Sequence, residues 1–266
     1  MSALNLIIGR ERAFLLTDSL LYLASGEVTG FARKCEIAPK AKIAVAARGD
    51  HRLPLSFALA VDDDYGCIDD LIADAGEGVF WRYSATLQRF NDRLHLDFMQ
   101  QLAFAGWSQA EGRPMGVSMI LGQDESFEVV RDGIASPLPG PAELDQLHAL
   151  GAEPGEDWMP DTFDPIRHGL PYLEAQRRMI IETRWGDDGN KAHVIGGELT
   201  LTTITRDCID QRVIHSWPDE IGKVIVPEPF VQPAPPAGSR QAQRTTERQA
   251  KKLKNRAVLL SFLTNE

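Results

Sequence analysis

The order in which strand-like and helix-like segments follow one another constrains the fold of this chain most strongly. The opening fifty residues contain short apolar runs that are typical of strands, at 3–8, 12–17, 30–36 and 42–47. Apolar residues then recur at helical spacing from Leu53, and one long helix is predicted from about Ala85 to Trp107. Further strands are predicted at 115–121, 126–131, 192–195, 198–205 and 211–216, with a helix near 163–184. This order favours a layered α+β fold over a doubly wound parallel sheet.

The C-terminal part of the chain differs in composition from the rest. Five prolines between residues 227 and 236 prevent a regular helix or a central strand, so the core should end just before them. We therefore predict a globular domain over residues 1–226, a proline-rich linker over 227–239 and a basic amphipathic helix or tail over 240–266. The basic segment fits a helix docked on its own acidic core or on a neighbouring subunit, or a tail that binds an acidic partner.

Charge and the N-terminal pattern argue against several classes of protein. The formal net charge is −10, whereas a general nucleic-acid binder needs a dominant positive field. Arg10, Glu11 and Arg12 interrupt the first apolar run, which leaves neither the apolar stretch of a signal peptide nor a membrane span. The expectation is a cytoplasmic protein that binds neither nucleic acid nor membrane.

No metal or cofactor site is expected from the sequence. The cysteines Cys35, Cys67 and Cys208 lie far apart without paired ligand spacing, so they indicate buried thiols rather than a zinc site or a disulfide framework. The six histidines occur singly, and the sequence contains no Gly-x-x-x-x-Gly-Lys loop for phosphate.

Three polar residues near the N-terminus have a spacing that suggests chemistry. Removal of Met1, which a small second residue generally permits, would leave Ser2 with both a hydroxyl nucleophile and a free α-amine. Asp18 and Lys34 follow at two successive intervals of sixteen residues. A nearby ammonium lowers the pKa of an α-amine, and a carboxylate can hold that ammonium in place. Ser2, Lys34 and Asp18 could play these parts.

Three motifs surround these residues. They are residues 13–19 (Ala-Phe-Leu-Leu-Thr-Asp-Ser), 29–34 (Thr-Gly-Phe-Ala-Arg-Lys) and 42–50 (Lys-Ile-Ala-Val-Ala-Ala-Arg-Gly-Asp). In register, they resemble the peptidase subunits of the proteasome family, especially the bacterial subunit that works with a ring ATPase. The resemblance covers about the first fifty residues well, is weaker to about residue 217 and ends there. It implies a four-layer αββα sandwich, in which two antiparallel sheets pack face to face between outer helices.

The same resemblance implies an N-terminal-nucleophile hydrolase that cleaves peptide bonds. Ser2 would attack and its α-amine would relay the proton, while Lys34 tunes that amine and Asp18 holds Lys34. The backbone amide of Gly49 would donate to the oxyanion, and Ala46 would set the floor of the specificity pocket. The subunits would form a closed homo-oligomeric ring that takes peptide or protein substrates, with a ring ATPase as a possible partner.

Five positions depart from the family pattern. Ser2 stands where the family has an N-terminal threonine as its nucleophile. Asp50 places a carboxylate where the family usually has a second glycine, near the developing oxyanion. Ala152, in the loop 150–155, and Ile195 stand where serines are expected, and Ala192 stands where an aspartate often lies. Two further hypotheses therefore stay open: a catalytically inactive proteasome-like scaffold that self-assembles or binds a partner, and an amidase that acts on a small molecule.

Overall fold

The computed structural model describes residues 3–90, 100–121, 126–135, 160–182 and 191–228. The chain divides into two compact units, residues 1–228 and 229–266, and the second unit lies outside the described residues. Nearly all of the predicted linker and the whole predicted basic tail therefore lie outside them too. The first unit is mixed α+β with antiparallel sheets, which confirms the fold class at that level.

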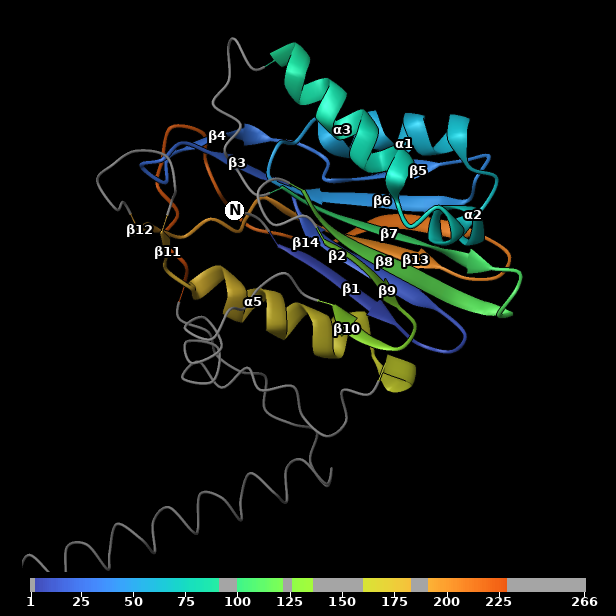
Figure 1. Ribbon diagram of the computed structural model, residues 1–266. Helices are drawn as coiled ribbons and strands as arrows, with labels where there is room; N and C mark the ends of the chain where they lie inside the picture. Colours follow the sequence, from blue (N-terminus) through green and yellow to red (C-terminus); the bar gives the residue numbers. More distant parts are fainter. Residues whose placement is uncertain (1–2, 91–99, 122–125, 136–159, 183–190, 229–266) are drawn as a thin grey trace, which may run out of the picture. The chain divides into compact units, whose positions relative to one another are not determined.

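Two five-stranded antiparallel sheets form the centre of this unit (Figure 1). The first sheet has the strand order β10-β1-β2-β13-β14, and the second has the order β5-β6-β7-β8-β9. Two small sheets pair β3 with β4 and β11 with β12. The strands are β1 Leu4–Ile8, β2 Ala13–Asp18, β3 Leu20–Tyr22, β4 Val28–Phe31, β5 Cys35–Ala38, β6 Ile43–Arg48, β7 Gln100–Ser108, β8 Arg113–Leu121, β9 Ser126–Val130, β10 Gly133–Ala135, β11 Ile181–Glu182, β12 Lys191–Ala192, β13 Glu198–Ile204 and β14 Ile209–Ser216.

Pairing of β2 with β13 brings together segments that are far apart in the sequence. β1 and β2 form the predicted N-terminal hairpin, whose turn closes where the Gly9 N–H donates to the Arg12 carbonyl at 3.0 Å. On its other side β2 pairs with β13, with Leu199 opposite Asp18. Because the register of a strand pair fixes which residues are neighbours, the segment just before β13 lies beside the end of β2.

The two large sheets pack on each other through apolar side chains. Alternate residues of β1 and β2, including Leu6 and Leu15, share one buried cluster with alanines of β6 and β7. Gly116 of β8 lies so near Leu6 that a Cβ atom there would come within 2.8 Å of the Leu6 side chain. Small residues on the second sheet thus leave room for large residues of the first. The buried residues of this intersheet cluster are Leu4, Leu6, Ile8, Ala13, Leu15, Cys35, Ala44, Ala46, Ala103, Ala105, Val130 and Ile204.

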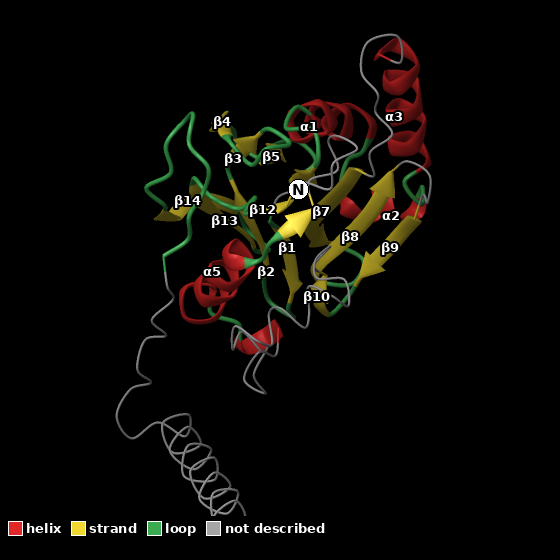
Figure 2. Cartoon of the chain, turned by 90° about the vertical axis from the view of Figure 1, so that its left-hand side faces the viewer, coloured by secondary structure: helices red, strands yellow, loops and turns green. Residues whose placement is uncertain are grey.

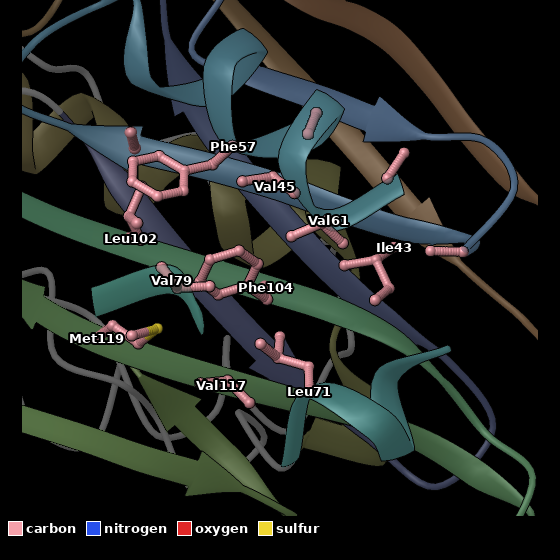
Figure 3. Close-up of a cluster of buried hydrophobic side chains, with 14 of the residues drawn as sticks. Ile43, Val45, Phe57, Val61, Leu71, Val79, Leu102, Phe104, Val117 and Met119 are labelled. Atoms are coloured by element: carbon pink, nitrogen blue, oxygen red, sulfur yellow. The ribbon is translucent and has the colours of Figure 1, made fainter. Parts of the chain in front are cut away.

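Helices pack on the other side of each sheet, so that in Figure 2 the strands run between helices. On the second sheet, helices α1 to α3 share a cluster with β6, β7 and β8, in which Val61, Leu71 and Phe104 are fully buried (Figure 3). On the first sheet, Leu173 of α5 is buried against β1, β2 and β13. None of the helices in the described part of the chain is long and apolar enough to cross a membrane. The helices are α1 Leu53–Asp64, α2 Ile68–Ala73, α3 Glu77–Phe90 and α5 Leu170–Arg178, with a 3-10 turn at Pro160–Thr162 and a π-helical turn at Pro165–Gly169.

Two predicted helices were wrong in extent. One helix was predicted from about Ala85 to Trp107. In the structure, α3 ends at Phe90 and strand β7 begins at Gln100, while residues 91–99 lie outside the described part. β7 is buried on both faces, so its apolar residues lack the alternation of a half-exposed strand and imitate helical spacing. The helix predicted near 163–184 is shorter, because Met179 adopts an extended backbone directly after α5.

Replacement of Leu71 by alanine should lower the free energy of unfolding by about 2–5 kcal/mol, because this side chain is fully buried and its loss leaves a cavity. Leu59→Ala is the matched control. Leu59 is also a helical leucine but is 61% exposed, so its truncation should change the free energy of unfolding by less than about 0.5 kcal/mol. Urea unfolding followed by circular dichroism measures both values. Equal losses would contradict the packing of α2 on the second sheet.

Candidate functional site

Asp18 and Lys34, two of the predicted site residues, form a buried ion pair. Lys34 Nζ lies 3.0 Å from Asp18 Oδ1, and the two side chains are 3% and 0% exposed. Asp18 is the last residue of β2, whereas Lys34 lies between β4 and β5, where the predicted strand 30–36 is interrupted. The Ala47 N–H of β6 donates to the Lys34 carbonyl at 3.0 Å, which links this connection to the second sheet. The ion pair therefore lies where the two sheets approach each other.

Three backbone amides complete the surroundings of the Asp18 carboxylate. The Ala3 N–H donates to Oδ1 at 2.8 Å, and the N–H groups of Leu20 and Gly196 donate to Oδ2, each at 3.2 Å. Together with Lys34, the two oxygens accept hydrogen bonds from four donors, so the protein replaces the lost hydration of the buried charge. The carboxylate thereby joins the start of β1, the first residue of β3 and the segment before β13.

Burial lowers the pKa of Lys34 below the ordinary value of a lysine, because the enclosed ammonium loses its hydration. The charge of Asp18 and its hydrogen bond act in the opposite direction and fix the position of the ammonium. A positive charge held in this way disfavours a second positive charge nearby, so it would help to keep an adjacent amine neutral.

Ser2 lies outside the described residues, but its neighbour Ala3 is placed. Ala3 is buried, and its N–H donates to the same Asp18 oxygen that accepts from Lys34 Nζ. The chain therefore enters β1 beside the ion pair.

Gly49, the predicted oxyanion residue, directly follows β6. Its φ of +126° belongs to a region that glycine adopts far more readily than other residues. A Cβ atom at this position would collide with the side chain of Gln100, whose Oε1 accepts the Asp50 N–H at 2.7 Å. The close neighbour of Gly49 is thus Gln100 of β7.

The Asp50 carboxylate, which the sequence places near the oxyanion position, is bound by Arg52. The backbone N–H and the Nε of Arg52 both donate to Asp50 Oδ1 at 2.9 Å. Burial disfavours the ionised carboxyl, but these hydrogen bonds and the charge of Arg52 outweigh it and hold the pKa of Asp50 below its ordinary value. Its negative charge is therefore balanced by a cation two residues away.

The glycines of the Ile195-Gly-Gly197 element lie on the other side of Asp18, and Ser19 ties them to β2. The Ser19 N–H donates to the Gly196 carbonyl at 3.2 Å, and Ser19 Oγ accepts the Glu198 N–H at 2.8 Å. Gly197 has φ +73°, and a Cβ atom there would collide with Ser19 Oγ. Ser19 was not predicted as a site residue. The one signal for it in the sequence is its position directly after Asp18.

The remaining positions from the sequence have other surroundings. Ala192 lies in β12 and Ile195 is buried in the cluster under α5, while Ala152 lies outside the described residues. Ala46 is completely buried in the intersheet cluster, so its methyl group does not line an open pocket as expected. Within the described residues, histidine, cysteine and acidic side chains form no group of three that could hold a metal ion.

The Lys34 side chain should titrate below about pH 10.4, the ordinary value for lysine, when its Cε resonance is followed by NMR. Between the folded and unfolded pKa values the unfolded chain binds more protons, so the contribution of Lys34 to the free energy of unfolding rises with pH there. Asp18→Asn should lower the pKa of Lys34 further, because it removes the charge that favours the ammonium. Lys34→Arg identifies the resonance by its loss. An ordinary pKa in the folded protein would contradict the enclosed pair.

No protein-family model matches this sequence, and no curated protein matches it either. Membership of the proteasome family therefore stays a prediction from the motifs.

Proposed function

We propose that the protein is an N-terminal-nucleophile hydrolase that cleaves amide bonds with Ser2 after removal of Met1. The observation that carries this proposal is the sharing of Asp18 Oδ1 by Lys34 Nζ, at 3.0 Å, and the Ala3 N–H, at 2.8 Å. An α-amine titrates near pH 8 in water, and a fixed ammonium close to it favours the neutral form that can act as a base. The packing of helices, two sheets and a further helix supports a four-layer αββα sandwich.

The proposed reaction is acyl transfer in two steps. The hydroxyl of Ser2 attacks the carbonyl carbon of the scissile amide, and the α-amine of Ser2 takes up the hydroxyl proton through a water molecule. The Gly49 N–H donates to the oxyanion. As the C–N bond breaks, the α-ammonium returns its proton to the leaving amine, and an ester remains on Ser2. A water molecule, deprotonated by the same amine, then hydrolyses the ester and restores the hydroxyl.

The resemblance extends the proposal to assembly and substrate. The subunits would form a closed homo-oligomeric ring, and a ring ATPase would deliver peptide or protein substrates to the sites inside. Leu55 of α1 and Trp81 of α3 are each more than half exposed. Exposed apolar residues of this size are often covered in subunit contacts, which supports an oligomer.

An inactive proteasome-like scaffold is the second candidate, and two observations favour it. The Asp18–Lys34 pair is so enclosed that it can serve as a structural link without any chemistry. Ile195 also offers no polar group where the family pattern has a supporting serine. In such a scaffold the amine of Ser2 could remain in a peptide bond with Met1.

Intact-protein mass spectrometry after incubation with an epoxyketone probe should show a chain that lacks Met1 and carries one adduct. An epoxyketone reacts with a neighbouring hydroxyl and amine together, so Ser2 is the residue expected to react. Ser2→Ala keeps the free amine but removes the hydroxyl, so this control should lose the adduct without loss of stability.

Three outcomes would count against the enzyme. Met1 retained in protein from its native host would exclude chemistry at Ser2. An adduct that persists in Ser2→Ala would place the reaction elsewhere. A processed chain that neither reacts with the probe nor hydrolyses a peptide library would favour the scaffold.

A further inference from the structure

A second buried ion pair, Arg177 with Asp219, lies directly behind the glycine segment that contacts Asp18. Arg177 Nη1 lies 2.8 Å from Asp219 Oδ2, Arg177 Nη2 lies 2.5 Å from Asp219 Oδ1, and the two side chains are 6% and 5% exposed. Arg177 belongs to α5, whereas Asp219 follows β14. Two parallel hydrogen bonds give this pair a defined geometry that a single contact would lack.

Both members of this pair also hold the backbone of residues 195–197. Arg177 Nη1 donates to the Ile195 carbonyl at 2.7 Å, and Asp219 Oδ2 accepts the Gly197 N–H at 2.8 Å. Gly196 lies between these two contacts, and a Cβ atom on it would collide with both Asp219 and Arg177. The ion pair therefore packs directly on Gly196, whose own N–H points to Asp18 Oδ2 at 3.2 Å.

Trp217 completes the support. Its ring lies 5.1 Å from the guanidinium carbon of Arg177, and its backbone N–H donates to the Gly197 carbonyl at 2.8 Å. The indole N–H donates to Glu174 Oε1 at 2.7 Å, which fixes the ring on α5. A cation held between a carboxylate and an aromatic face has little freedom to move.

We propose that Arg177 and Asp219 are positioning residues, which hold the Gly196 N–H against Asp18 and so set the place of the Asp18–Lys34 pair. Through their hydrogen bonds to residues 195–197, they supply the support that the family pattern assigns to a serine side chain at position 195. The catalytic consequence rests on the proposed function, whereas the effect on the ion pair does not. Neither residue touches the substrate in this proposal.

The test is the Lys34 titration in Arg177→Lys. A lysine keeps the charge but cannot reach the Ile195 carbonyl and both carboxylate oxygens together. When the Gly196 N–H withdraws, Asp18 has one donor fewer and attracts the Lys34 ammonium more strongly. The pKa of Lys34 should therefore rise by about one unit toward its ordinary value. Arg82→Lys is the matched control, because Arg82 of α3 forms a similar two-bond pair with Asp64 of α1, among the helices on the second sheet.

The outcomes separate this proposal from the proposed function. An unchanged Lys34 titration in folded Arg177→Lys would overturn the positioning role. If that variant does not fold, the Lys34 titration is measured in Asp219→Asn instead. This variant keeps the size of the side chain and one acceptor oxygen, and an unchanged titration would again overturn the positioning role. The rate of epoxyketone labelling should fall about tenfold in Arg177→Lys and stay unchanged in Arg82→Lys. If the wild-type protein is neither labelled nor able to hydrolyse the peptide library, the hydrolase proposal fails, but the titration still decides the role of Arg177.

Discussion

The enclosed contact between Lys34 and Asp18 is the interaction on which the rest of the described structure depends. Removing two charges from water costs several kcal/mol for each ion, and the mutual attraction offsets this only when further hydrogen bonds satisfy the remaining lone pairs. Here the further donors are the backbone amides of Ala3, Leu20 and Gly196, which belong to three separate segments. The carboxylate is fully bonded only when β1, β2 and β13 are in register, so the fold and the candidate site require each other.

Much of the first sheet could be predicted from the sequence, because the hairpin of β1 and β2 has short apolar strands and a polar turn. The meeting of Asp18 with Lys34 was predictable from the motifs around them, whereas an aspartate in a turn and a lysine near a strand end are ordinary features on their own. Strand β7 could not be predicted from the sequence in the same way. Its residues Leu102 and Phe104 face the helices while Ala103 and Ala105 face the first sheet, and burial on both faces erases the alternation that identifies a strand.

The contacts between distant segments could not be predicted from composition or periodicity. Arg177 and Asp219 are 42 residues apart, and an arginine in a helix or an aspartate after a strand usually contacts solvent. They become partners because β13 pairs with β14. This pairing brings Asp219, which follows β14, back to Gly197, which precedes β13. The pairing of Asp50 with Arg52 differs, because the two residues are only two positions apart and their contact depends on the local turn alone.

Gly196 and Gly197 connect the two ion pairs, because their successive N–H groups donate to different carboxylates. Gly196 bonds Asp18, whose cation is Lys34, and Gly197 bonds Asp219, whose cation belongs to α5. A shift of this dipeptide toward either carboxylate would leave the other one short of a donor, at a cost of about 1–3 kcal/mol or more for a charged group. The two glycines are thus held in place through their own backbone N–H groups. The side chain at position 195 is then free to be apolar, and it packs in the cluster under α5.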